Sequence, residues 1–141
     1  MPDLNFIRTF ALGALLGIGG CAFVSNDESA EALKANAEKH VTFQVAASPS
    51  LACSKTARML MGCAGGPNYH YRCQTTSDGG RAELAGVLEA VYRTEFFMVT
   101  EFVRSGGDSA VTVHQHDSVL TYDYAPLIEG YFSGTTTCQP R

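Results

Sequence analysis

The stretch Thr94-Glu-Phe-Phe-Met-Val-Thr-Glu-Phe-Val-Arg104 decides the fold of this chain. Successive side chains of a strand point to opposite faces, and in this stretch large apolar residues fall on both faces. A run that is apolar on both faces is typical of a strand in the middle of a sheet. We therefore predict a central strand over residues 94–104, and the segments around it have to supply its neighbours.

The segment that follows predicts the strand on one side of this central strand. Ser105-Gly-Gly-Asp108 is a turn signal, and residues 110–116 then alternate between apolar and polar side chains. Val111 and Val113 would face inward and Thr112 outward. We expect the two segments to form an antiparallel hairpin.

The segments that precede it predict two more strands, over residues 68–76 and 81–88, joined by the turn signal Asp78-Gly-Gly80. The second of these has an alternative, because part of it also has helical spacing and neither Gly nor Pro marks a turn at residues 90–93. We predict a strand and keep the helix as the alternative. The residues with helical spacing are Leu84, Leu88, Val91 and Tyr92.

The remaining elements complete an α+β fold. Residues 41–46 alternate as a half-buried strand does, and Ser48 with Pro49 begins a helix that a glycine pair at residues 65–66 ends. Asp123 begins a second helix near the carboxyl end. The order β-α-β-β-β-β-α predicts a small antiparallel sheet with the helices packed on one face.

The amino-terminal residues carry a signal of a different kind. An apolar run over residues 10–20 ends at Cys21, and a polar segment begins at Ser25. Ile18-Gly19-Gly20-Cys21 resembles the lipobox of bacterial lipoproteins, in which a signal peptidase cleaves before a cysteine that carries lipid. The resemblance implies that residues 1–20 are a removed signal peptide and that acyl chains such as palmitate on Cys21 anchor the protein in a membrane.

Two other interpretations of this segment are open. A secretory signal without lipidation also has an apolar middle and a small-residue cleavage site. A retained transmembrane helix over residues 10–24 is disfavoured, because crossing a bilayer takes about 20 apolar residues and this run is shorter. In bacterial lipoproteins, an aspartate directly after the lipidated cysteine resembles a signal for retention in the inner membrane. This chain has Ala22 at that position, so the resemblance implies that the protein is anchored in the outer membrane and faces the periplasm.

The part of the chain after Cys21 is predicted to have two regions. Residues 22–39 contain almost no large apolar side chain, so we expect residues 21–40 to form the lipidated cysteine and a tether. Residues 41–141 form a single α+β domain, of a length that suits one core. Its outline resembles a reduced helix-grip layout, and also short periplasmic lipoproteins of unknown function.

The four cysteines after Cys21 predict two disulfides, because an even number is expected in an oxidising periplasm. Cys53 and Cys63 lie in one predicted helix about 15 Å apart, which is too far for a bond. A strand that doubles back after the helix brings Cys73 alongside Cys53. We therefore prefer the pairs Cys53–Cys73 and Cys63–Cys138.

A metal site is the first of two candidate binding sites. His114 and His116 occupy alternate positions of a predicted strand, so their imidazoles share a face, and Asp117 or His70 could add a third ligand. Two histidines on the exposed face of a strand are more often ordinary polar surface. No cofactor is expected.

The second candidate is an apolar cavity between sheet and helices, which would bind a small apolar ligand or a lipid. The alternative is that the same side chains fill the core. The residues expected to line the cavity are Tyr69, Tyr71, Phe96, Met98 and Phe102.

Composition and motifs argue against other functions. The formal net charge is −4 and Lys and Arg do not cluster, so we expect no nucleic-acid partner. There is no Gly-x-Ser-x-Gly motif, and the carboxylates Glu83, Glu89, Glu95 and Glu101 are expected to be solvated, so we predict that the protein is not an enzyme. We predict a lipid-anchored envelope protein, a non-catalytic interaction or assembly module for which another envelope protein is a candidate partner.

Overall fold

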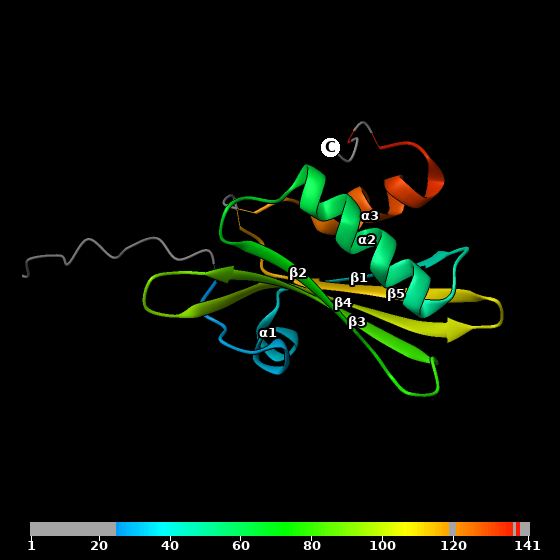
Figure 1. Cartoon of the computed structure of the whole chain (residues 1–141), viewed down its shortest axis with the longest axis horizontal. Coiled ribbons are helices and arrows are strands. Elements are labelled where there is room, and N and C mark those ends of the chain that lie inside the picture. The colour runs from blue at the N-terminus through cyan, green and yellow to red at the C-terminus, as the bar shows by residue number, and fades with distance from the viewer. Residues whose placement is uncertain (1–24, 119–120, 137, 139–141) are drawn as a thin grey trace, which may run out of the picture.

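Among the described residues, five strands form one antiparallel sheet in the order β1-β5-β4-β3-β2, and three helices cover it (Figure 1). The computed structural model describes residues 25–118, 121–136 and 138. The predicted order of strands and helices after residue 40 is confirmed, and residues 81–89 are a strand. The elements are α1 (Ala30–Asn36), β1 (Lys39–Val45), α2 (Pro49–Cys63), β2 (Tyr69–Thr75), β3 (Arg81–Glu89), β4 (Thr94–Ser105), β5 (Asp108–Gln115) and α3 (Tyr124–Ser133).

Strand β4 lies in the centre of the sheet, between β3 and β5, as its sequence predicts. Met98 and Phe102 face one side of the sheet and pack into its main core, while Val99 faces the other side. All three side chains are fully buried. A central strand with two apolar faces needs a packed layer on each of them.

Helices α2 and α3 form the layer on one side, which we call the α2/α3 face (Figure 1). Pro49 begins α2, a position at which the missing N–H of proline costs no helical hydrogen bond. Leu60 of α2 and Ile128 of α3 are fully buried against the sheet. The prediction that these helices share a face is confirmed.

Phe97 stands at the centre of this core because of a local irregularity in the sheet. The register of β3 and β4 shifts between Gly86 and Val87, and this β-bulge turns both Phe97 and Met98 toward the α2/α3 face. The Phe97 ring covers Gly86 so closely that a Cβ atom at Gly86 would lie 2.6 Å from ring carbon Cε2. Glycine is therefore required at this position by packing.

Helix α1 covers the opposite side of the sheet, which we call the α1 face (Figure 1). Leu33 is completely buried there against Val99, with Ala30 and Phe96 beside it. The prediction that residues 21–40 form a tether is therefore wrong for residues 25–38, and only α2 and α3 share one face. A seven-residue helix is unstable alone, but the second apolar face of β4 supplies the packing that stabilises it.

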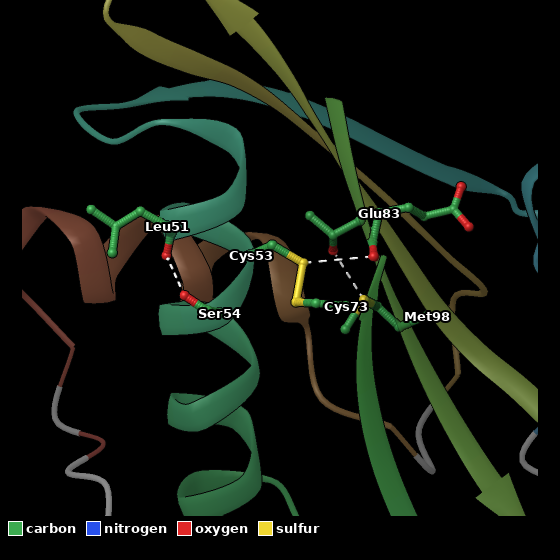
Figure 2. The surroundings of a disulfide bond; sticks show 7 residues. Leu51, Cys53, Ser54, Cys73, Glu83 and Met98 are labelled. Atoms are coloured by element: carbon green, nitrogen blue, oxygen red, sulfur yellow. Dashed lines mark hydrogen bonds between the residues drawn. A yellow bond between two sulfur atoms is a disulfide. The ribbon is translucent and has the colours of Figure 1, made fainter. Parts of the chain in front are cut away.

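Two disulfides hold the α2/α3 face together. Cys53–Cys73 joins α2 to β2 with its Cα atoms 6.0 Å apart, and Met98 lies beside the bond (Figure 2). Cys63–Cys138 joins the end of α2 to the segment after α3, with its Cα atoms 5.8 Å apart. Both predicted pairs are confirmed.

Candidate functional site

The amino-terminal segment is attached to the sheet from the first described residue onward. The Ser25 amide donates to Glu95 Oε2 at 3.2 Å, and the Arg93 guanidinium donates to the Ser25 carbonyl at 2.6 Å. The Phe96 amide donates to the Asp27 carbonyl at 2.8 Å. The Glu95 side chain is 3% exposed, and Arg93 Nε pairs with it at 3.2 Å, so its charge is compensated. The expectation that Glu95 is solvated is wrong.

His116 makes the second attachment. Its Nε2 lies 2.6 Å from Asp27 Oδ2 and its Nδ1 lies 2.7 Å from Glu38 Oε2. Burial alone would lower the pKa of His116, but the hydrogen bonds to these two carboxylates outweigh it and raise the pKa above the ordinary value of 6.5. His116, directly after β5, therefore contacts both ends of the segment that contains α1.

Lys34 makes the third attachment, from α1 itself. Glu83 of β3 and Glu101 of β4 lie directly opposite each other in the sheet, an arrangement that is unfavourable for like charges. Lys34 Nζ lies 2.7 Å from Glu83 Oε2 and 3.6 Å from Glu101 Oε1, and so compensates both carboxylates. The hydrogen bond to Glu83 is the largest cause that raises the pKa of Lys34.

Two histidines extend this network of polar side chains across the α1 face. His114 Nε2 lies 2.8 Å from Glu101 Oε2, and His114 Nδ1 lies 2.7 Å from Nδ1 of His40 on the edge strand β1. Partial burial alone would raise the pKa of Glu101, but the His114 hydrogen bond and the Lys34 charge outweigh it and hold that pKa below 4.5. The network connects β1, β5, β4, β3 and α1 by charge and hydrogen bonding.

The structure does not unite the residues predicted to bind a metal. His114 and His116 share the α1 face, as predicted, but His114 contacts Glu101 while His116 contacts Asp27 and Glu38. His70 lies on β2, at the other edge of the sheet, 3.5 Å from Glu89. Within the part of the chain that the structure describes, no three His, Cys, Asp or Glu side chains are placed to hold a metal ion.

The residues predicted to line an apolar cavity also separate. Phe96 packs on the α1 face, whereas the other four, Tyr69, Tyr71, Met98 and Phe102, belong to the core of the α2/α3 face. The prediction of one cavity lined by all five is wrong, because the bulge in β4 interrupts the alternation between Phe96 and Met98, so that these two side chains face opposite sides of the sheet.

Aromatic side chains fill the space where that cavity was expected. The Phe97 ring contacts Tyr69, Tyr71 and Tyr124, with ring centres 5.4, 5.8 and 5.8 Å apart. The Tyr71 hydroxyl donates to the Ala64 carbonyl at 2.8 Å. Burial raises the pKa of Tyr71 to about 12. These side chains build the core, which is the alternative that the sequence left open.

A cleft of about 330 Å³ lies on the α1 face, beside the Lys34 bridge. Lys34, Arg81, Glu83 and Glu101 contribute charged groups to its lining, and Phe102 is the one member of the predicted cavity set on its border. Because Lys34 is already paired with both carboxylates, the cleft has the chemistry of a structural ion-pair network.

Sequence reasoning missed the attachment of the amino-terminal segment through Asp27 and Glu95. It also missed the contact between His40 and His114. One signal was present: Ala30, Leu33 and Ala37 recur at i, i+3 and i+7, as on the buried side of a helix. All three are buried, and the Ser29 side chain caps α1 by accepting from the Ala32 amide.

Cys21 and its lipobox lie outside the described residues. None of the helices in the ranges that the structure describes is long and apolar enough to span a membrane. Comparison with known proteins gives no match to a family model, to a curated protein or to a solved structure. Functional inference therefore rests on the residues themselves.

Proposed function

We propose that this protein is a lipid-anchored component of the bacterial cell envelope that acts through its surface, as a non-catalytic interaction or assembly module. The observation that carries the proposal is the distribution of the cysteines. Four of the five pair with one another in two disulfides, which leaves Cys21 of the lipobox as the thiol for lipid attachment. Paired cysteines in a small domain favour an oxidising compartment such as the periplasm.

The arrangement of polar groups supports a surface function over catalysis. The histidines and carboxylates of the α1 face are engaged in pairs that attach α1 or connect strands, as His116 with Asp27 and His114 with Glu101 do. The main core is filled by side chains, so the apolar-ligand alternative has no cavity built from its predicted residues. What the fold offers a partner is its outer surface.

The attached amino-terminal segment determines where this surface would act. Four residues span at most about 14 Å of extended chain, so Ser25 would lie within that distance of the lipidated residue. Because Ser25 is bonded to Glu95 and Arg93, the whole domain would stay close to the membrane. We propose contacts with membrane-proximal partners.

Labelling with palmitate tests the anchor. We expect the wild-type chain expressed in bacteria to incorporate labelled palmitate and to fractionate with the outer membrane. Cys21→Ser should abolish both, whereas Ala22→Ser, which keeps the thiol and changes its neighbour, should retain the label. An unlabelled wild type, or a Cys21→Ser protein that matures and localises like wild type, would overturn the lipid anchor.

Crosslinking in intact cells tests the interaction module. We expect a short crosslinker to trap one reproducible envelope protein with the wild type, and to trap it less when Cys21→Ser keeps the domain away from the membrane. A labelled, correctly localised protein that is trapped with no specific protein would refute the interaction function while leaving the anchor intact.

A further inference from the structure

The β3–β4 hairpin carries the most exposed apolar side chains in the described part of the chain. Val91 is 90% exposed and Tyr92 is 98% exposed, whereas the next large hydrophobic residue, Tyr122, is 56% exposed. The two residues form the tip of a turn that the hydrogen bond from the Ala90 amide to the Arg93 carbonyl closes at 2.9 Å. None of the residues that the structure describes covers them.

The composition of this tip is unusual for a hairpin. The other two hairpins of the sheet turn through glycine, with Gly79 and Gly106 in the left-handed region. Tight turns favour Gly, Asn and Asp because these residues adopt turn conformations at little cost. A β-branched residue and an aromatic residue at a solvent-exposed tip do not help the turn, so their side chains point to an external contact.

The position of the tip identifies that contact. Arg93, next to Tyr92, donates to the carbonyl of Ser25, the first described residue. Figure 1 shows the described chain beginning, in blue, beside this hairpin, with the β4–β5 turn at the opposite end of the sheet. The tip therefore lies at the end of the molecule from which the chain leads back to Cys21, four residues earlier.

We propose that the hairpin tip, Val91 and Tyr92, inserts into the headgroup region of a phospholipid bilayer. This inference rests on the proposed lipid anchor, which brings the tip to the membrane surface. Tyrosine is favoured in that region because its ring is apolar and its hydroxyl stays hydrated.

The charges beside the tip are compatible with this contact. Arg93 pairs with Glu95, and Glu89 pairs with Arg72. Insertion of the tip therefore leaves neither Arg93 nor Glu89 without a partner of opposite charge. The contact uses apolar area and not cationic groups. It is therefore expected to be insensitive to salt and to the fraction of anionic lipid.

A single tryptophan tests the proposal, because the chain contains none. The Tyr92→Trp variant, as the lipidated full protein, is placed in phosphatidylcholine vesicles with and without brominated lipid. We expect its emission to shift to the blue and to be quenched by bromine. The matched control is Ser105→Trp, an exposed position at the other end of β4, which should be quenched several-fold less.

The outcomes separate this inference from the anchor. Palmitate-labelled protein that floats with vesicles but shows equal, weak quenching for Tyr92→Trp and Ser105→Trp would overturn membrane insertion and leave the anchor standing; the tip would then be a site for a protein partner. If the chain carries no lipid, quenching of Tyr92→Trp at high lipid concentration would still support insertion. Absence of quenching in that case would overturn both proposals.

Discussion

The two faces of the sheet are stabilised by different physics. The α2/α3 face has an aromatic and aliphatic core around Phe97 and two covalent crosslinks. The α1 face has a small apolar contact at Leu33 and Val99, surrounded by ion pairs and histidines. Apolar burial and disulfides do not depend on pH near neutrality, whereas the ion pairs of His116 do. The first face is therefore expected to maintain the fold, and the second to regulate how firmly the amino-terminal segment is attached.

Removing the disulfides of the α2/α3 face should cause the largest loss in the free energy of unfolding. Cys63 and Cys138 are 75 residues apart and Cys53 and Cys73 are 20 apart, so loop-closure entropy predicts losses of about 4 and about 3 kcal/mol for the paired Cys→Ala variants. Urea unfolding followed by circular dichroism measures both. A smaller loss from the longer loop would contradict the entropic explanation.

Leu33→Ala should destabilise the packing of α1 on the α1 face. Deleting the one fully buried leucine of α1 should cost about 3 kcal/mol of the free energy that holds α1 on the sheet. Hydrogen exchange should then accelerate in residues 29–37 while β3 and β4 stay protected. The exposed neighbour substitution Glu31→Gln is the control, and uniform acceleration across the sheet would show that the two faces unfold together.

Gly86→Ala tests the packing of the α2/α3 core. The new Cβ would lie 2.6 Å from Phe97 Cε2, so the ring has to move, at a cost of about 2 kcal/mol. Thermal unfolding measures this loss. Gly107→Ala adds the same group where nothing lies within 4 Å and should be nearly neutral. Equal losses in the two variants would show that the contact with Phe97 is not the cause of the loss.

Thr56→Val should stabilise the α2/α3 face. The Thr56 hydroxyl is buried in α2 and has no hydrogen-bond partner among the described residues, so replacing it with a methyl group should gain about 1 kcal/mol. Thr42→Val on the α1 face, where the hydroxyl contacts Thr112 at 3.0 Å, is the matched comparison and should not stabilise. Chemical denaturation distinguishes them, and a destabilised Thr56→Val protein would reveal a hidden partner.

Changing pH should alter the stability of the α1 face and leave the α2/α3 face unchanged. This effect on stability should be the smallest of those predicted. The raised pKa of His116 means that its contribution is complete below pH 6.5 and is lost as pH rises through the folded-state pKa. The lowered pKa of Glu101 means that its contribution is complete above pH 4.5 and is lost as pH falls. Protection of α1 should therefore be greatest between these values.

Hydrogen exchange of residues 25–38 across this range measures the effect. His116→Gln should remove the loss on the alkaline side and leave the loss on the acidic side. An alkaline loss of the same size in His116→Gln would assign the titration to another group.

The elements of the main domain could be predicted because their signals are local. Alternation in residues 41–46 and the two-sided apolar run at 94–104 each correspond to an observed strand. The disulfide pairs followed from helix geometry and the direction of the next strand. The segment before residue 39 could not be assigned in this way, because a short helix acquires its stability from a surface elsewhere in the chain.

The pattern of side chains along the chain determined the order of helices and strands, the central position of β4 and the pairing of the cysteines, since each depends on spacings of a few residues or on the reach of one element. Only the tertiary structure decided which polar residues meet. Asp27 and His116 are 89 residues apart, and Lys34 and Glu83 are 49 apart. The packing of α1 on the second apolar face of β4 brings these residues together, and no local spacing encodes such contacts.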